Sequence, residues 1–434
     1  MKYELSKYVR FLAYKDSLIC MQMNKRLIFA LEDVNSNLLL NNLNNINLIR
    51  EVKPHLFSAL IKLGVIKDAN ENEFDEIKNA NFKEIFDKKL RLTIIPTLEC
   101  NLSCWYCYET HIKGLISDET INSILIYIRR MINDFAIEEI ELDWFGGEPL
   151  LHFYDVMVPT IEKVKYICQI NNVRLSQVIT TNGSLIDNEM VLKFNEIGLI
   201  NFQITLDGKE EIHNKIRNDQ LKTGTYKIIV DAVNMICENM KTANVLLRIN
   251  YTSKSIGSIN EIIEDFPIQN RNNIKVLFQQ VWQLENKNKP LDLETYYNTF
   301  RKEGFQVEFN RFNNYNIACY ADKYYQSVIN FNGDVYKCTA RDFADRSLRA
   351  GYLNKDGIII WDSESHKKRF RASTIENKFC RNCEYVPLCY GPCSQKQLEL
   401  EKMDSESFKR ICYKKGLETS VERAMIEFYE TTFK

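Results

Sequence analysis

The sequence predicts an α/β protein whose centre is a partial (β/α)6 barrel. From residue 90 onward, six apolar, strand-like runs alternate with long segments of helical periodicity, and this alternation is typical of a parallel sheet with crossover helices. Right-handed crossovers would curl such a sheet, and six units instead of eight favour an open barrel. The strand-like runs are LRLTIIPT, EIELDWFGG, LSQVITTNG, LINFQITLDG, VLLRINYT and IKVLFQQVW.

The segments between these runs carry apolar residues on one helical face. After the first run, apolar residues recur at i, i+3, i+4 and i+7 spacing, at Ile121, Ile124, Leu125, Ile128, Ile132 and Phe135. A later segment repeats the pattern at Ile229, Val233, Ile236, Cys237 and Met240. This period predicts amphipathic helices that pack on the sheet.

Two further regions flank the predicted barrel. Residues 1–88 alternate short extended runs with turn residues and then become helical, which predicts a small α+β, winged-helix-like module. The C-terminal region is rich in cysteine and closes with a helical segment around 414–430. The predicted domains are therefore 1–88, 89–300 and 301–434.

Composition limits the possible partners. The 434 residues contain 57 Lys and Arg against 58 Asp and Glu, a net charge of -1, so the basic surplus of a nucleic-acid binder is missing. No apolar run approaches the roughly 20 residues that span a bilayer, and the first residues lack the apolar core of a signal peptide. We expect a cytoplasmic protein with no nucleic-acid or membrane partner.

Cysteine is unusually abundant for such a protein. The chain has 13 cysteines, and disulfides are rare in the cytoplasm, which favours metal ligation. Cys20, Cys168 and Cys237 stand alone, the last two on apolar helical stripes, and are predicted to pack as small hydrophobic residues. The other ten fall into two groups.

The first group directly follows the first barrel strand. In ECNLSCWYC, Cys100, Cys104 and Cys107 have the spacing C-x3-C-x2-C. Three thiolates can hold three irons of a four-iron cluster, which leaves one iron with an open position for chemistry. The loop also leaves the C-terminal end of a strand, where barrel active sites lie.

This motif resembles the signature of the radical S-adenosylmethionine (radical SAM) superfamily, in which an aromatic residue, here Tyr106, precedes the third cysteine. The resemblance implies a fold of the radical SAM type. It also implies that the open iron binds the methionine amino and carboxylate groups of SAM, and that one electron cleaves SAM to a 5'-deoxyadenosyl radical. Such a radical suits an unactivated C–H bond, and the protein then has to orient the substrate and exclude water.

The resemblance extends to the predicted contacts with SAM. The GGEP turn after the second strand implies contacts with the methionine amino group, and the TTNG and TLDG segments imply approaches to its ribose and carboxylate. The segment DGKEEIHNKIR leads to an arginine that could neutralise the SAM carboxylate or could simply be a solvated helix charge. The implied cofactor-binding residues are Tyr106, Gly146, Gly147, Glu148, Pro149, Thr181, Asn182, Thr205, Asp207 and Arg217.

The second cysteine group has its own regular spacing. C-x13-G-x4-C precedes C-x2-C-x5-C-x3-C and a late cysteine, formed by Cys319, Cys338, Cys380, Cys383, Cys389, Cys393 and Cys412. Structural zinc is one alternative, because C-x2-C pairs build zinc sites. Zinc would account for four of these cysteines and leave three without a role.

The complete order resembles the SPASM extension of radical SAM enzymes, which holds two auxiliary four-iron clusters. The resemblance implies three [4Fe–4S] clusters in all. It assigns one ligand set to an outer cluster, Cys380, Cys383, Cys389 and Cys412, and a second to an inner cluster, Cys319, Cys338 and Cys393. The fourth ligand of the inner cluster stays open.

The resemblance also implies the class of substrate, because SPASM enzymes mostly modify peptides or proteins. The N-terminal module resembles the recognition element that binds the leader of a ribosomal (RiPP) precursor peptide, by adding it as a strand to a sheet edge. We therefore expect a peptide maturase that abstracts hydrogen from a precursor peptide and installs a crosslink, with a thioether favoured over carbon–carbon or ether links. Flavodoxin or ferredoxin would donate electrons.

Two alternatives remain. The first is a maturase for a folded protein, as in anaerobic sulfatase maturation; those enzymes place a catalytic aspartate after the second SPASM cysteine, whereas Thr339 follows Cys338 here. Asp342 is the nearest carboxylate, and its role is open. The second is a zinc-bound, peptide-binding scaffold without enzymatic activity. The N-terminal module could also be a helper domain that only packs on the barrel.

Overall fold

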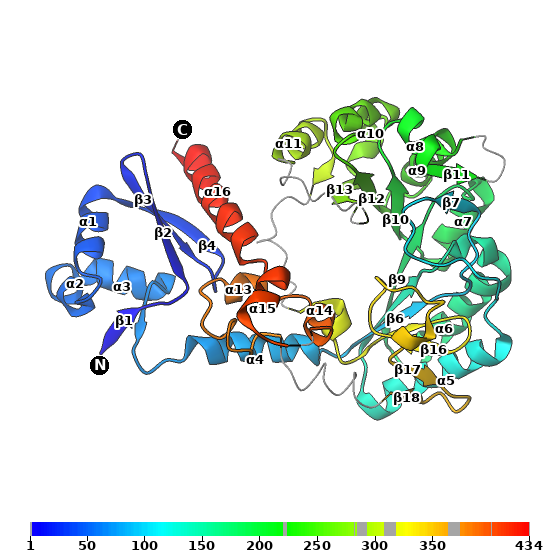
Figure 1. The fold of residues 1–434 in the computed structure, drawn as a ribbon, viewed down its shortest axis with the longest axis horizontal. Helices are drawn as coiled ribbons and strands as arrows, with labels where there is room; N and C mark the ends of the chain where they lie inside the picture. The colour runs from blue at the N-terminus through cyan, green and yellow to red at the C-terminus, as the bar shows by residue number, and fades with distance from the viewer. Residues whose placement is uncertain are drawn as a thin grey trace. The chain divides into compact units, whose positions relative to one another are not determined.

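The computed structural model describes residues 2–219, 224–281, 283, 293–307, 318–362, 374–400 and 402–433. The chain forms two compact units, and each is described by itself (Figure 1). One unit comprises Met1–Asp87, Phe312–Tyr324 and Glu364–Lys434. The other comprises Lys88–Arg311 and Tyr325–Ser363 and is called the barrel unit below.

The barrel unit contains the predicted parallel sheet. All six predicted strands form and pair in parallel in the order of the chain, which confirms the fold class. They are β6 (Lys89–Ile94), β8 (Glu139–Trp144), β9 (Arg174–Thr181), β10 (Asn201–Leu206), β12 (Asn244–Tyr251) and β13 (Ile274–Gln280).

Helices cover the outer side of this curved sheet (Figure 1). The main ones are α5 (Asp118–Phe135), α6 (Val158–Ile170), α7 (Asn188–Ile197), α8 (Glu210–Ile216), α9 (Tyr226–Asn239), α10 (Ile268–Arg271) and α11 (Glu294–Lys302). The predicted stripe of α5 is buried from Ile121 to Ile128, whereas Phe135 at the end of the helix is exposed. Helix α5 begins at Ser117, whose side chain accepts a hydrogen bond from the Thr120 N–H, a typical N-cap.

The sheet extends beyond the predicted barrel. Next to β6 lies β15 (Gln326–Ile329), which pairs with it in parallel, and the antiparallel strands β16 (Asp334–Tyr336), β17 (Gly351–Leu353) and β18 (Ile359–Trp361) follow. Strand β14 (Gln306–Val307) lies beside β13 at the other edge. Short 3-10 and π turns complete the unit: η1 (Pro149–His152), η2 (Phe153–Met157), η3 (Ile256–Asp265) and η5 (Arg346–Leu348).

The other unit is called the N/C unit, because it joins the two ends of the chain. Its antiparallel sheet consists of β2 (Val9–Tyr14), β3 (Ser17–Gln22) and β4 (Leu27–Glu32), and a second pair joins β1 (Tyr3–Leu5) to β5 (Ile66–Asp68). Its N-terminal helices are α1 (Asp33–Asn41), α2 (Ile46–Val52), α3 (Pro54–Leu63) and α4 (Glu73–Ile85). Its C-terminal helices are α13 (Val386–Cys389), α14 (Ser394–Leu398), α15 (Ser405–Ile411) and α16 (Lys414–Thr432), and η4 (Tyr320–Asp322) lies between.

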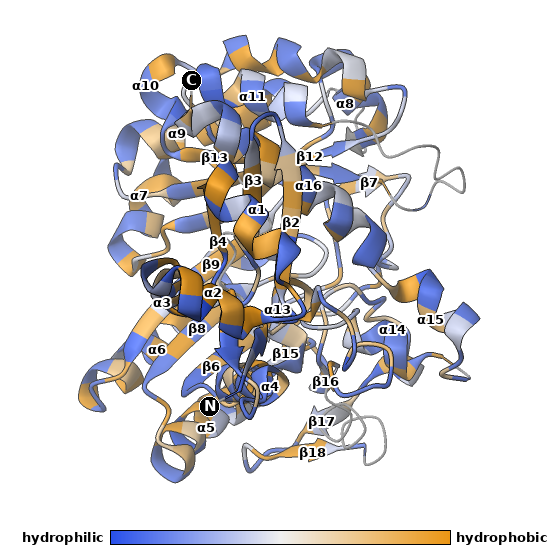
Figure 2. Cartoon of the chain, turned by 90° about the vertical axis from the view of Figure 1, so that its left-hand side faces the viewer, coloured by the Kyte–Doolittle hydropathy of each residue, from blue (hydrophilic) through white to orange (hydrophobic). Residues whose placement is uncertain are grey.

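Both faces of the central strand β3 are buried. Residues of β3 alternate between two apolar cores, with Leu18 and Cys20 in one and Ile19 and Met21 in the other. Figure 2 shows the resulting hydrophobic colouring along β2 and β3. Among the described helices, none is long and apolar enough to cross a membrane.

Candidate active site

The first cysteine motif lies in the loop that leaves β6. Its middle cysteine ends the short strand β7 (Leu102–Cys104), which pairs antiparallel with β11 (Arg217–Asp219). The Cys100 sulfur accepts hydrogen bonds from the Leu102 N–H at 3.4 Å and the Asn182 side-chain amide at 3.8 Å. Burial, and next the nearby Glu148 carboxylate, raises the pKa of the Cys100 thiol to about 12. A bound metal would favour the thiolate that this environment disfavours.

The GGEP turn after β8 packs directly against this loop. The Gly147 N–H donates to the Thr97 carbonyl at 3.3 Å, and the Glu148 N–H donates to the Glu99 carbonyl at 2.8 Å. A Cβ on Gly147 would lie 2.2 Å from the Glu99 carbonyl oxygen, and Gly146 has a φ of +118°. Only glycine allows the two loops to approach so closely. Pro149 then starts η1.

The Glu148 carboxylate is completely buried and joins two strand ends. It accepts hydrogen bonds from the Leu150 N–H at 3.0 Å, the Thr181 hydroxyl at 2.7 Å and the Asn182 N–H at 2.7 Å. Burial raises the pKa of Glu148, and these hydrogen bonds oppose that shift. The site therefore offers a preorganised acceptor where β8 and β9 end.

A second buried acid lies at the end of β10. The Asp207 carboxylate accepts from the Tyr106 hydroxyl at 2.7 and 2.8 Å and from the Arg217 Nε at 2.5 Å. The Asn250 side chain, at the end of β12, donates to the Tyr106 hydroxyl at 2.9 Å. Arg217 is only 8% exposed, so it is no solvated helix charge. Thr205, two residues before Asp207, is also buried.

The His213 side chain binds the backbone of Asp207. Its Nδ1 accepts the Asp207 backbone N–H at 3.2 Å, and its Nε2 lies 3.1 Å from the Thr225 hydroxyl. Burial, followed by the charge of Arg217, lowers the pKa of His213 to about 3. The residue is therefore a neutral imidazole with its proton on Nε2. The sequence analysis assigned no role to either His213 or Asn250: His213 lies inside the DGKEEIHNKIR segment, whose resemblance assigns a role to Arg217, and Asn250 lies in the fifth strand-like run.

The sequence left the role of Asp342 open, and the structure gives it local partners. Its carboxylate accepts from the Thr110 N–H at 3.0 Å and the Thr110 hydroxyl at 2.6 Å. Burial alone would raise the pKa of Asp342, but the hydrogen bonds from Thr110 outweigh that effect and lower it. Asp342 thus stays ionised and is a weak proton acceptor. Nearby Glu109, which the sequence did not single out, is buried, and desolvation raises its pKa to about 8.

The four predicted ligands of the outer cluster come together in the N/C unit. They surround one cavity of about 230 Å³, which Lys414 also lines; these cysteines are Cys380, Cys383, Cys389 and Cys412. Burial raises the pKa of the Cys383 thiol, and a backbone hydrogen bond at Tyr385 and the positive charge of Lys414 partly oppose that shift. The cavity has the donor set that an iron–sulfur cluster requires.

The predicted ligands of the inner cluster belong to both units. Cys319 and Cys393 line a cavity of about 400 Å³ in the N/C unit, together with Asp322 and Tyr320. Cys338 follows β16 in the barrel unit. This ligand set therefore stays a prediction.

Within the described ranges, no three His, Cys, Asp or Glu side chains lie close enough together to hold a single metal ion. The isolated cysteines Cys20, Cys168 and Cys237 are buried, in keeping with a packing role.

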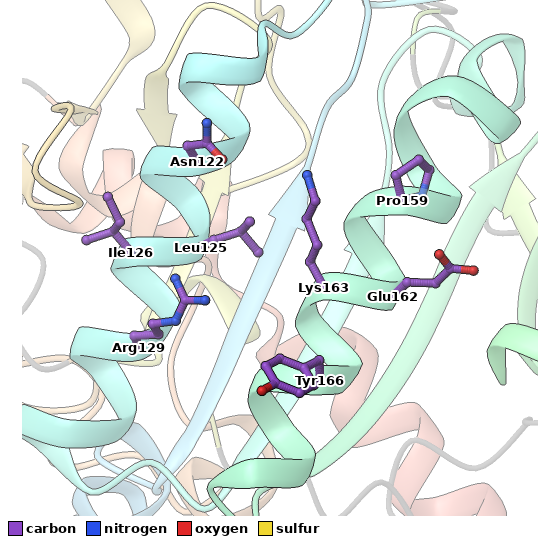
Figure 3. A pocket seen from close by; sticks show the side chains of 8 residues that line it. All are labelled: Asn122, Leu125, Ile126, Arg129, Pro159, Glu162, Lys163 and Tyr166. Atoms are coloured by element: carbon purple, nitrogen blue, oxygen red, sulfur yellow. The ribbon is translucent and has the colours of Figure 1, made fainter.

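A separate cavity of about 700 Å³ lies between α5 and α6 (Figure 3). Arg129 and Lys163 are among its lining side chains, and it contains no cysteine and no residue of the predicted site.

Comparison with known proteins identifies two regions. The model of the radical SAM superfamily matches residues 94–264, and the SPASM model, an iron–sulfur cluster-binding domain, matches residues 319–384. Members of the first family bind SAM and a [4Fe–4S] cluster, and SPASM domains hold further clusters.

Similar proteins align with about three quarters of this chain. A cysteine-type anaerobic sulfatase-maturating enzyme of Clostridium perfringens (strain 13 / Type A) is 24% identical over 360 residues, 73% of this chain and 92% of the relative. A serine-type enzyme of Bacteroides thetaiotaomicron is 22% identical over 377 residues, 75% and 88% of the two chains. The structure of native anSMEcpe with bound AdoMet and Kp18Cys peptide has the same fold, with a TM-score of 0.57, 18% identity, and coverage of 77% of this chain and 99% of that one.

Proposed function

Because the chain contains a radical SAM domain and a SPASM domain, we propose that this enzyme is a maturase that installs a crosslink in a ribosomal precursor peptide. The observation that supports this most is the meeting of three motifs at the strand ends. The cysteine loop after β6, the GGEP turn after β8 and the Asp207–Arg217 pair after β10 all lie at the C-terminal edge of one parallel sheet. Active sites of barrels form at that edge.

Each residue of this edge then has a proposed task. Cys100, Cys104 and Cys107 would hold the SAM-binding cluster, whose reductive cleavage of SAM supplies the 5'-deoxyadenosyl radical. Glu148 would hold the methionine ammonium. The remaining predicted contacts would fix the rest of SAM: Tyr106, Gly146, Gly147, Pro149, Thr181, Asn182, Thr205, Asp207 and Arg217.

The residues after β10 would have different roles in binding SAM. The Arg217 Nε donates to Asp207 at 2.5 Å, and its Nη2 donates to the Tyr106 hydroxyl at 3.1 Å. The guanidinium has five N–H groups, so others could still donate to a carboxylate. We infer that Asp207 and Tyr106 orient Arg217, and that Arg217 meets the SAM carboxylate.

A peptide substrate is supported by the N/C unit. The first 87 residues lie outside both family matches and build a three-stranded sheet. In the part of the chain that the structure describes, β2 and β4 are the edges of this sheet. An exposed edge can accept an extended leader as an additional strand, and that is the docking site we propose.

Maturation of a folded sulfatase is the second candidate, and the relatives favour it. The enzymes of that class align with about three quarters of this chain. Against it stands Thr339 after Cys338, where those enzymes carry an aspartate, and Asp342 is already bound by Thr110. The leading proposal therefore keeps the crosslink, with a thioether favoured because a cluster with three cysteine ligands could bind a peptide thiolate.

Mass spectrometry distinguishes the two candidates. The purified enzyme is incubated anaerobically with SAM and dithionite, either with the precursor peptide encoded beside its gene or with a sulfatase peptide that contains the target cysteine. A crosslink removes two hydrogen atoms from the precursor, whereas sulfatase maturation converts the cysteine to an aldehyde. Conversion of the sulfatase peptide alone would overturn the proposal. Without any 5'-deoxyadenosine, the radical SAM assignment itself would fail.

A further inference from the structure

The three-stranded sheet of the N/C unit has two faces with different neighbours. On β3, Leu18 and Cys20 belong to the core formed with α1, α2 and α3, called the helix face. Ile19 and Met21 belong to a second core, called the cysteine face. The same alternation continues on β4, where Phe29 packs with the helix face and Ile28 with the cysteine face.

The cysteine face shares its core with the outer-cluster ligands. Cys380 is buried in this core, and the other three predicted ligands pack against it: Cys383, Cys389 and Cys412. Helix α16 closes the same core, with Val421 and Met425 completely buried. Strand β3 and the outer-cluster loops thus bury one another.

Polar contacts join the same elements. The Lys7 ammonium donates to the Arg381 carbonyl at 3.1 Å. Arg381 lies between Cys380 and Cys383 in the sequence. The Tyr14 hydroxyl donates to Glu430 of α16 at 2.9 Å. These hydrogen bonds connect the N-terminal strand region to the loop of Cys380 and Cys383 and to helix α16.

The segment that carries these cysteines has little regular structure of its own. Helices α13, α14 and α15 have 4, 5 and 7 residues, and helices this short are not stable alone. In such segments a bound metal group supplies much of the folding free energy. Losing the cluster would therefore loosen the loops that cover the cysteine face.

We propose that the outer auxiliary cluster is a structural staple of the peptide-docking sheet, so that loading of this cluster orders β2, β3 and β4. The inference rests on the proposed function only in assigning peptide docking to this sheet. Because linkage is reciprocal, a peptide that binds and orders the sheet would also stabilise the cluster. Loading of the outer cluster with iron would then control substrate capture.

Hydrogen exchange measured by mass spectrometry tests the staple directly. The full-length holoenzyme is compared with the variant Cys383→Ser/Cys412→Ser, which removes two predicted outer-cluster ligands. We expect the amides of β2, β3 and β4 to exchange at least about tenfold faster in the variant. The control is Cys104→Ser in the barrel unit, which removes a ligand of another cluster and should leave these amides unchanged. Equal protection in all three proteins would overturn the proposal.

The reverse direction is tested on neighbouring residues of β3. Met21→Ala shortens a side chain of the cysteine face, and Leu18→Ala shortens one of the helix face. Met21→Ala should lower iron content by up to one cluster and alter the auxiliary part of the electron paramagnetic resonance spectrum. Leu18→Ala should leave both unchanged. Equal iron loss in the two variants would contradict a specific link.

Uncoupled cleavage of SAM, measured in the same samples, separates this inference from the proposed function. If the wild-type enzyme forms 5'-deoxyadenosine but the exchange rates do not respond to Cys383→Ser/Cys412→Ser, the staple fails and the radical SAM activity stands. If exchange responds but no 5'-deoxyadenosine appears, the staple stands and the proposed activity fails.

Discussion

At the scale of single residues, the candidate site depends on buried charges that other side chains hold. Asp207 is completely buried, and Arg217 beside it is almost so. A buried ion pair contributes little net stability as long as it is intact, but an unpaired partner is costly. The pair is therefore best explained by positioning, with Tyr106 and Asn250 fixing its geometry.

Asp207→Asn should destabilise the protein strongly, because it leaves the Arg217 guanidinium buried without its carboxylate. We expect a loss of about 3 to 5 kcal/mol in the free energy of unfolding, measured by urea titration of the barrel unit's transition. Arg174→Ala is the control, because Arg174 forms an exposed ion pair with Glu139 and such pairs contribute less than about 1 kcal/mol. Similar losses in both variants would contradict this view of the pair.

His213 should make stability depend on pH. Its pKa is about 3 in the folded protein and about 6.5 in an unfolded chain. Below pH 6.5 the unfolded state binds the proton and the folded state does not, so stability is complete above pH 6.5 and falls as the pH decreases below it. Between pH 7.5 and 5.5, we expect His213 to lower the free energy of unfolding by about 1.4 kcal/mol.

The variant His213→Asn isolates this contribution, because the Asn oxygen can still accept the Asp207 N–H but does not titrate in this range. In this variant, the difference in the free energy of unfolding between pH 7.5 and 5.5 should be smaller than in the wild type by about 1.4 kcal/mol. An unchanged pH dependence would show that the pKa of His213 is the same in the folded and the unfolded protein, and would contradict its burial as a neutral imidazole.

At this scale the sequence identified residues that belong to spaced motifs. The cysteines of both groups, Glu148 and Asp207 stand in recognisable patterns, and the structure brings Cys100, Glu148 and Asn182 together. His213, Asn250 and Glu109 were not found. Asn250 contacts Tyr106, which lies far away in sequence, and His213 contacts Asp207 and Thr225 only because the chain folds back between them; a lone polar residue on a strand or helix gives no signal of such contacts.

At the scale of elements, strand ends and their loops determine the site. The loops after β6 and β8 pack so closely that Gly147 has no room for a side chain. This close approach places the cysteine loop next to Glu148. Gly147 thus allows the cysteine loop and Glu148 to lie next to each other.

Gly147→Ala should displace the cysteine loop, because the added Cβ would lie 2.2 Å from the Glu99 carbonyl and 2.5 Å from that of Leu98. We expect the variant to lose the SAM-binding cluster and its 5'-deoxyadenosine formation while it keeps auxiliary-cluster iron. Gly257→Ala is the matched control, since a Cβ there meets nothing within 4 Å. Wild-type SAM cleavage by Gly147→Ala would contradict the close packing.

Strands could be predicted where they alternate regularly with helices, and not where this alternation is missing. The six parallel strands alternate with helices of clear period, and all six form. Strand β15 was not predicted, because QSVI is a short run between cysteines. It is nevertheless buried and pairs in parallel with β6. Its partner lies more than two hundred residues earlier, and local periodicity carries no information on such a pairing.

At the scale of the whole molecule, the ends of the chain fold together. The first 87 residues join residues 364–434 in the N/C unit, whereas the sequence ranges 1–88, 89–300 and 301–434 stay predictions for functional domains. Composition and spacing divide a chain along its length, so they could not reveal that β3 packs against α16. Strand β3 carries apolar residues on both of its faces, and one of these faces makes the contact with α16.

This packing alters what a truncation would do. Without residues 1–87, the cysteine face is lost, and buried residues of the C-terminal segment, among them Tyr385, Val421 and Met425, would meet solvent. Exposure of such a patch favours aggregation. We expect the fragment 88–434 to lose outer-cluster iron when expressed alone, and to regain it when the fragment 1–87 is expressed with it, because the two fragments can rebuild the shared core.

Co-purification of the two fragments, with iron content and the auxiliary electron paramagnetic resonance signal as readouts, measures this reassembly. Carboxylates cannot be buried in an apolar core without a large cost, so a 1–87 fragment with Ile19→Asp and Met21→Asp should neither co-purify nor restore iron. A fragment with Lys53→Asp, a helix N-cap outside both cores, should still do both. If 88–434 alone holds its complete iron content, the N-terminal sheet is an independent module, and its cysteine face has no part in forming the outer-cluster site.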